Sequence, residues 1–109
     1  MEFKLGWRRD LPDKRDRRYG ASIVPEVALP PAVSLRAHMP EIHNQGSLGC
    51  CTAEAVCGLL HYRELTDSNP RLVNPSVLFQ YYNTRVLEGT VKEDSGASIR
   101  NAVKAAAQF

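Results

Sequence analysis

The segment Asn44-Gln45-Gly46-Ser47-Leu48-Gly49-Cys50-Cys51-Thr52-Ala53 sets the tightest limits on this chain. Its two glycines permit a tight turn, which ends where an amphipathic helix is predicted to begin, at about Cys51. A thiol at a helix N-terminus lies beside unpaired backbone N–H groups and the positive end of the helix dipole, which favour the thiolate. The Gln45 amide, six residues upstream, is a donor that the turn can fold back toward the sulfur. A nucleophile beside such donors is the minimum equipment for acyl transfer.

The composition is that of one globular domain, with 109 residues of which 43% are hydrophobic and 24% charged. No apolar run approaches the roughly 20 residues of a membrane span, and the N-terminus lacks the apolar stretch of a secretory signal. The three cysteines, Cys50, Cys51 and Cys57, are an odd, clustered set without the spacing of a disulfide framework or a zinc site. We therefore expect a cytoplasmic protein with no metal, cofactor or membrane segment.

Basic residues are concentrated at the N-terminus, where seven of the 14 lysines and arginines fall within the first 20 residues. Four acidic residues are interleaved with them and no aromatic ladder accompanies them, so a solvated or docking arm is favoured over nucleic-acid binding. Pro12 and Pro25 disfavour regular structure. We predict an extended basic arm over residues 1–28, able to lay Trp7 on a neighbouring surface, and a domain over residues 29–109.

Within that domain, prolines punctuate an extended stretch from Leu29 to Ile42, and three helices follow. The stretch has three candidates for burial, which are Val33, Leu35 and Ile42. The first helix is predicted from about Cys51 to Leu65, because apolar residues recur there at helical spacing. Its apolar stripe consists of Ala53, Val56, Cys57, Leu60 and, at its edge, Leu59.

The second helix is predicted to begin with Asn74 as N-cap and Pro75 at its first position, and to end before Gly89. Its apolar residues are Val77, Leu78, Tyr81, Tyr82 and Val86, and the tyrosine pair is interpreted as packing. The third helix is predicted after Asp94-Ser95-Gly96 and reaches Phe109 without a glycine or proline stop, a pattern that suggests a fold expecting more chain. Its predicted apolar face is formed by Ile99, Ala102, Val103, Ala106 and Ala107.

These segments together resemble the papain-like cysteine peptidases. Gln45–Ala53 resembles the family's active-site segment, usually Gln-Gly-x-Cys-Gly-Ser-Cys-Trp-Ala. Leu29–Arg36 is similar to the family's opening Leu-Pro-x-x-Val-Asp-x-Arg, and Asn74–Leu78 to the helix that follows a Leu-Ser segment. Asp94–Ala97 matches the glycine-bearing loop of the substrate groove. The arm, with Gly-Trp and Asp-Leu-Pro-Asp, looks like the leader of bacterial members.

The resemblance implies an α+β papain-like fold, of which this chain is mainly the helical half. It implies that Cys51 is the nucleophile and that the Gln45 amide and the Cys51 N–H form the oxyanion hole. It places Gly49 at the wall of the groove, and gives Gly96 and Ala97 backbone hydrogen bonds to an extended substrate. The implied activity is hydrolysis of peptide bonds in a peptide or protein through an acyl-enzyme.

The chain departs from the family pattern at several positions. Leu48 stands where the family has a cysteine that bonds to one in the groove loop, and the loop here reads Asp94-Ser95, so both disulfide partners are absent together. That joint loss agrees with a reducing compartment. Thr52 replaces the usual aromatic residue, and Cys50 replaces a serine and creates a pair of adjacent thiols.

The family's catalytic His and Asn follow the nucleophile by roughly 130–150 residues, whereas 58 residues follow Cys51 here. His38, His43 and His61 do not match the family's base. We therefore expect the isolated chain to be nearly inert and to associate through exposed apolar surface, with the missing C-terminal half or a second copy as partner. Two alternatives stay open: a non-catalytic interaction module, and a thiol redox sensor that uses Cys50 and Cys51.

Overall fold

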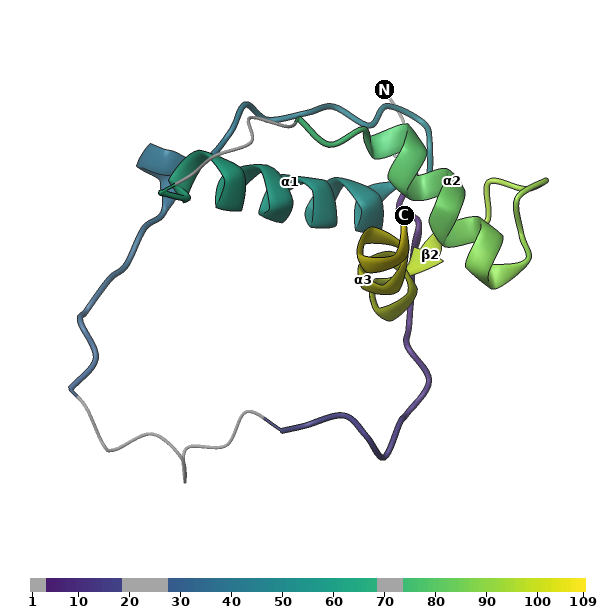
Figure 1. The fold of residues 1–109 in the computed structure, drawn as a ribbon, viewed down its shortest axis with the longest axis horizontal. Helices are drawn as coiled ribbons and strands as arrows, with labels where there is room; N and C mark the ends of the chain where they lie inside the picture. Colours follow the sequence, from purple (N-terminus) through teal and green to yellow (C-terminus); the bar gives the residue numbers. More distant parts are fainter. Residues whose placement is uncertain (1–3, 19–27, 69–73) are drawn as a thin grey trace.

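The computed structural model describes residues 4–18, 28–68 and 74–109. The elements follow one another as β1 (Trp7–Arg8), η2 (Arg36–His38), α1 (Cys51–Thr66), α2 (Val77–Glu88), β2 (Ala97–Ser98) and α3 (Ile99–Gln108). Figure 1 shows α2 and α3 gathered at the N-terminal end of α1, while the arm and the segment that precedes η2 extend away from the helices. The three helices expected from the sequence are present.

The core lies directly beneath the start of α1. Buried Cys50 and Ala53 meet Tyr81 of α2 and Ala97 of β2, and two partly buried side chains pack against this cluster, those of Leu48 and Val77. Tyr81 is 1% exposed and is the largest fully buried side chain among the described residues. The predicted nucleophile loop therefore rests on the hydrophobic core of the described residues.

Helix α1 confirms the prediction at both ends, since it begins at Cys51 and ends at Thr66, one residue beyond the expected Leu65. Ala53, Val56 and Cys57 are buried as the stripe required. Leu59 and Leu60 are exposed instead, because α2 and α3 cover only the first turns of the helix.

The start of α2 differs from the prediction. The N-cap is Ser76, whose Oγ accepts a hydrogen bond from the Phe79 N–H at 3.3 Å, and Asn74 and Pro75 lie outside the helix. A serine at this position satisfies one of the four N–H groups that a helix leaves unpaired, and that bond decides the boundary. The predicted end is confirmed, because Gly89 caps the helix at φ 71°.

The cap yields a first prediction. Ser76→Ala should lower the free energy of unfolding by about 1 kcal/mol, since the Phe79 N–H loses its partner. Asn74→Ala should leave it almost unchanged. Urea denaturation followed by circular dichroism measures both variants, and the reverse order of effects would restore Asn74 as the cap.

The apolar faces predicted for α2 and α3 are confirmed at Val77, Tyr81 and Ala102 and wrong at most other positions. Helix α3 buries Ala102 and Ala105, whereas Ile99 and Val103 are exposed. Helix α2 buries Gln80, Asn83 and Thr84 beside Tyr81, and other predicted apolar residues, Leu78, Tyr82 and Val86, are exposed. The two helices meet through small and hydrogen-bonded groups, since the Gln80 amide donates to the Ala102 carbonyl at 2.6 Å. Close approach through alanine turns the larger apolar residues outward.

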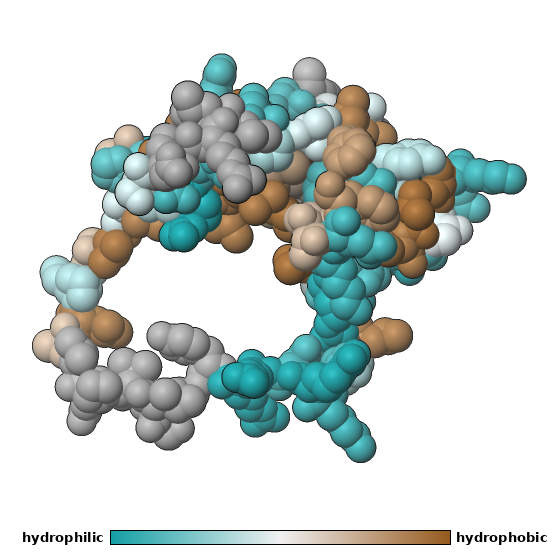
Figure 2. All heavy atoms as spheres, in the orientation of Figure 1, coloured by the Kyte–Doolittle hydropathy of each residue, from teal (hydrophilic) through white to brown (hydrophobic). Residues whose placement is uncertain are grey.

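The extended stretch also differs from the prediction. Val33, Leu35 and Ile42 are 75%, 54% and 92% exposed. Val33 lies in the part that extends away from the helices, whereas Leu35 and Ile42 line an open hollow beside α1. Figure 2 shows brown, hydrophobic atoms gathered over the helices, whereas the arm is mostly teal.

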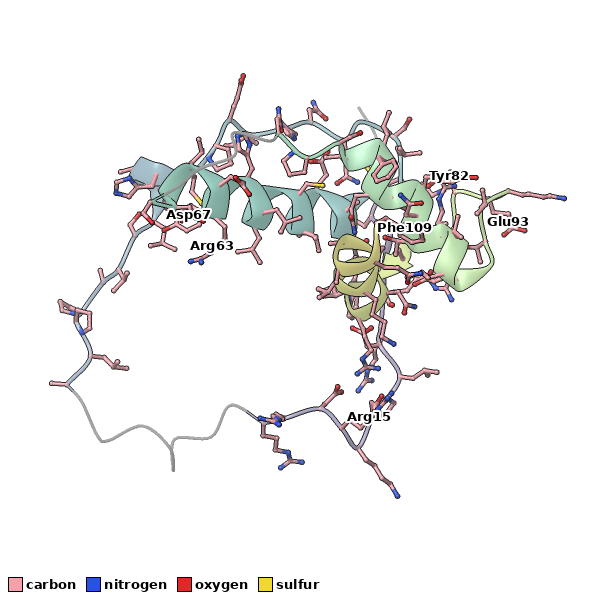
Figure 3. All side chains as sticks on the ribbon, viewed as in Figure 1. Arg15, Arg63, Asp67, Tyr82, Glu93 and Phe109 are labelled. Atoms are coloured by element: carbon pink, nitrogen blue, oxygen red, sulfur yellow. The ribbon has the colours of Figure 1, made fainter. Side chains whose placement is uncertain are left out.

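The arm contacts the helical unit at β1 and again at Arg100 of α3, whose backbone N–H donates to Asp10 and whose guanidinium donates to the Leu11 carbonyl and pairs with Asp16. Strand β1 pairs in parallel with β2, with Trp7 opposite Ala97 and Arg8 opposite Ser98. The Trp7 side chain remains 57% exposed, so the arm docks through its backbone rather than through its indole as predicted. Arg15, farther along the arm, lies well away from the helices (Figure 3).

Candidate active site

Cys51 is the first residue of α1, and its side chain is partly exposed rather than buried. The N-cap position is Cys50, which makes no capping hydrogen bond through its side chain. Because the first N–H groups of the helix lack helical partners, they remain donors at this end. The thiol is thus placed as predicted, at a helix N-terminus and within reach of solvent, and Cys51 is a free cysteine.

The turn before Cys51 is held by hydrogen bonds between residues that are close in sequence. Gly46 adopts φ 60°, a left-handed conformation that favours glycine, and its N–H donates to Asn44 Oδ1 at 2.9 Å. The Cys50 N–H donates to the Leu48 carbonyl at 2.9 Å. This local geometry brings the chain from the turn directly into the first residue of the helix.

The Gln45 amide, predicted as an oxyanion donor, donates from Nε2 to two carbonyl oxygens. One belongs to Leu48 in the same turn, at 2.9 Å, and the other belongs to Lys4 of the arm, also at 2.9 Å. A backbone carbonyl of an extended peptide therefore already occupies this donor.

The three glycines Gly6, Gly49 and Gly96 form a close backbone junction. A Cβ on Gly6 would lie 1.8 Å from the Gly49 carbonyl oxygen, and a Cβ on Gly96 would lie 2.0 Å from the Gly6 carbonyl oxygen. The Gly6 carbonyl accepts a hydrogen bond from the Ala97 N–H at 2.8 Å. The arm thus lies on the residues that the resemblance assigns to substrate binding, Gly49, Gly96 and Ala97.

Ion pairs flank this junction. Lys4 Nζ lies 2.7 Å from Asp94 Oδ2, and Arg8 lies 3.6 Å from Glu88. Glu88 is a buried carboxylate that also accepts hydrogen bonds from the Ser98 N–H at 2.9 Å and from Asn101 at 3.0 Å. The acidic groups that hold the arm are therefore built into the helical unit.

Asp94 links two parts of the site, although the sequence indicated it only as part of a loop. Its carboxylate accepts hydrogen bonds from the Gly49 N–H at 3.0 Å and from the Tyr81 hydroxyl at 2.6 Å. The Tyr81 oxygen in turn accepts from the Gly96 N–H at 3.0 Å. The absence of both family disulfide cysteines at these two loops is the one sequence signal that could have suggested a substitute link.

The pKa values keep this network in one charge state near neutral pH. Burial alone would raise the pKa of Asp94, but the hydrogen bonds from Lys4, Tyr81 and Gly49 outweigh it and hold that pKa below its ordinary 3.8. Burial and the bond to Asp94 raise the pKa of Tyr81 to about 12. Since the folded pKa of Asp94 is depressed, its contribution to stability is present at neutral pH and is lost as the pH falls through that value.

The other two thiols differ from Cys51. Cys50 and Cys57 are each 2% exposed. Burial, reinforced by Glu54, raises the pKa of both, that of Cys57 to about 11. Since thiolates are the reactive species, neither is a good nucleophile near neutral pH. A switch that pairs Cys50 with Cys51 is accordingly disfavoured.

Two of the three histidines, His43 and His61, line a separate hollow. His43 Nδ1 lies 3.3 Å from Glu54, and both residues line a hollow of about 660 Å³ together with His61 and Cys57. Cys51 is not among the residues that line this hollow, and His38 lies in η2. None of the three histidines contacts the turn through an interaction observed among the described residues, and none is assigned as a catalytic base.

Metal binding and membrane crossing were considered for the described ranges alone. There, no cluster of three or more histidine, cysteine or acidic side chains is arranged to hold a metal ion. Every helix in the same part of the chain falls short, in length or in apolar character, of what a membrane crossing requires.

Comparison with known proteins identifies two related molecules, although no protein-family model matches the chain. An uncharacterized peptidase C1-like protein of Acanthamoeba polyphaga mimivirus is 36% identical over 117 residues, which cover 92% of this chain and 37% of the viral protein. The crystal structure of xylellain, a cysteine protease from Xylella fastidiosa, matches with a TM-score of 0.70 and 32% identity. That match covers 95% of this chain and 40% of xylellain. The chain therefore spans well under half the length of either relative.

The predicted fold class is confirmed by this structural match. The three helices and the small strand pair correspond to part of a cysteine protease of known structure. The relatives are peptidase-like at the level of sequence and of structure alike. The chain thus has the fold of the helical half of a papain-like cysteine protease.

Proposed function

We propose that this chain supplies the nucleophile-bearing half of a papain-like cysteine peptidase that acts on peptides or proteins. The Cys51 thiolate attacks the scissile carbonyl carbon, and the negative charge that develops on the oxygen is received by the Gln45 amide and the Cys51 N–H. Collapse of this intermediate expels the amine, which takes up the proton that the Cys51 thiol had given to the general base of the complete reaction, and leaves a thioester on Cys51 that water then hydrolyses. None of His38, His43 and His61 is assigned as the general base of the complete reaction.

The observation that carries the proposal is the arm itself. An extended peptide backbone lies over the predicted substrate groups, with the Lys4 carbonyl on the Gln45 amide and the Gly6 carbonyl on the Ala97 N–H. These donors therefore have the geometry to bind peptide carbonyls. Because arm and substrate need the same donors, the arm must leave before a substrate binds.

The finer features of the proposal rest on the sequence. The motifs of the arm favour assignment to the bacterial type of the family, and the clustered free cysteines favour a location in a reducing cytoplasm. The division into an arm over residues 1–28 and a domain over residues 29–109 is part of this proposal and rests on the charge and proline pattern of the sequence. The exposed apolar side chains on α1 and α3 make a second protein surface, the C-terminal half or another copy, the expected partner.

Acylation by an activated ester tests the proposal without a general acid, because a nitrophenolate leaving group needs no proton. The arm is first displaced by Gly6→Ala, and the chain is mixed with a peptidyl nitrophenyl ester. We expect about one equivalent of nitrophenolate in a rapid phase and an acyl mass on Cys51 alone. Gln45→Ala in the same background should slow acylation by about 10²–10³-fold, the usual cost of one oxyanion donor.

Cys51→Ala in that background is the control and should abolish the rapid phase. Acyl groups on Cys50 or Cys57 as often as on Cys51 would contradict the proposal. No acylation of Cys51 by any ester, with the helices intact by circular dichroism, would favour the non-catalytic interaction module instead.

A further inference from the structure

The two loops that form the site are joined by a hydrogen-bonded network, which we name the Asp94 clasp. It consists of the Asp94 carboxylate, the Tyr81 hydroxyl and the backbone N–H groups of Gly49 and Gly96. Gly49 belongs to the turn that ends at Cys51, and Gly96 belongs to the loop that ends at β2. One carboxylate and one phenol therefore bridge segments that are 45 residues apart in sequence.

The turn is held from two directions. Asp94 accepts from the Gly49 N–H, with Oδ1 at 3.0 Å and Oδ2 at 3.2 Å, while the Gln45 amide donates to the carbonyl of the preceding residue, Leu48, at 2.9 Å. These bonds fix the Leu48–Gly49 peptide, two residues before the nucleophile. A shift of Asp94 would therefore move both Cys51 and the Gln45 amide.

The clasp is itself anchored. Tyr81 is 1% exposed within the core, and the Arg85 guanidinium stacks over its ring at 4.1 Å. Its hydroxyl donates to Asp94 and accepts from Gly96, so it uses both of its roles. Carboxylate hydrogen bonds of this kind are stronger than neutral ones, which suits a link between two loops.

We propose that Asp94, held in place by Tyr81, is the positioning residue that sets the geometry of the nucleophile loop, and that the same carboxylate anchors the arm through Lys4. The clasp takes the place of a covalent link between the two loops. The proposal rests on the proposed function in one respect, since it treats Cys51 as the nucleophile.

Three variants separate the two roles of Asp94. Lys4→Met removes only the contacts of the Lys4 ammonium with Asp94, Asp94→Ala removes both roles of the carboxylate, and Asp94→Asn keeps an acceptor for Gly49 without the charge that pairs with Lys4. The readouts are amide hydrogen exchange at Gly49 by NMR and the rate of Cys51 alkylation by iodoacetamide. All are measured on the full 109-residue chain.

We expect the Gly49 amide to exchange at least about tenfold faster in Asp94→Ala, a factor that corresponds to about 1.4 kcal/mol. It should keep its protection in Lys4→Met, and Asp94→Asn should recover most of it. Alkylation of Cys51 should differ between Asp94→Ala and Lys4→Met although the arm is loosened in both. Equal Gly49 exchange and equal Cys51 rates in these two variants would overturn the proposal and leave Asp94 as an anchor for the arm alone.

Tyr81→Phe keeps the test valid should Asp94→Ala fail to fold. It leaves Asp94 and Lys4 in place, and it should speed exchange at both Gly96 and Gly49, whereas unchanged exchange at Gly49 would contradict the clasp. Failure of the peptidase proposal is a separate result. In that case Cys51 resists the nitrophenyl ester, while Gly49 exchange still responds to Asp94→Ala.

Discussion

Gly6→Ala should detach the arm from the site. The added Cβ would lie 1.8 Å from the Gly49 carbonyl oxygen and 2.7 Å from its Cα, which are backbone atoms that no rotamer change can move. Gly49 is buried and bonded to Asp94, so the arm is the part that must yield. Overpacking of this kind costs about 1–3 kcal/mol, which corresponds to roughly 5- to 150-fold in the equilibrium between docked and free arm.

Trp7 reports the change directly, because it is the single tryptophan of the chain and pairs with Ala97 in the docked arm. Its fluorescence anisotropy should fall in Gly6→Ala, and Cys51 should be alkylated faster. Gly58→Ala is the matched control. A Cβ there would meet nothing within 4 Å, and alanine within a helix stabilises it by about 0.5–1 kcal/mol relative to glycine. Unchanged Trp7 anisotropy in Gly6→Ala would refute the docked position of the arm.

Tyr81→Phe should destabilise the fold, whereas Tyr82→Phe should not. The two residues are adjacent on α2, yet Tyr81 is 1% exposed and Tyr82 is 50% exposed, and Figure 3 shows Tyr82 on this helix. Loss of the Tyr81 hydroxyl leaves the buried Gly96 N–H without its acceptor and removes a donor from Asp94. An unsatisfied buried group costs about 1–3 kcal/mol, and exposed substitutions usually stay within about 0.5 kcal/mol.

Urea denaturation of both variants measures this difference. The packing volume of the ring is retained in each case, so the contrast isolates the hydroxyl group. Equal stabilities of Tyr81→Phe and Tyr82→Phe would mean that the Tyr81 hydroxyl contributes nothing beyond its ring.

Local signals in the sequence predicted the helices well. Periodicity and the glycine turn gave the start of α1 at Cys51, and Gly89 gave the end of α2. The start of α2 was missed because Asn74-Pro75 and Ser76 are both plausible start signals. Only the hydrogen bond to the Phe79 N–H, which depends on where the backbone becomes helical, distinguishes them.

Contacts between segments that are distant in sequence could not be predicted from these local signals. Nothing in the pattern of α2 indicates that Gln80 donates to Ala102 of α3, or that Tyr81 reaches Asp94. The Gln45 amide was correctly singled out as a donor near the turn, but one of its two acceptors, the Lys4 carbonyl, lies 41 residues away in sequence. Whether Gln45 and Cys51 act as oxyanion donor and nucleophile stays a prediction until the acylation experiment is done.

The junction between the two loops contains a carboxylate, a phenol and two amides, and no sulfur atom takes part in it. Dithiothreitol and similar agents break disulfides by thiolate attack, and they have no bond to attack here. Millimolar dithiothreitol can therefore keep the Cys51 thiol reduced throughout purification, while the hydrogen-bonded link between the two loops stays intact. In a protein whose two loops are joined by a disulfide, the dithiothreitol that keeps the active-site thiol reduced would also break the link between the loops.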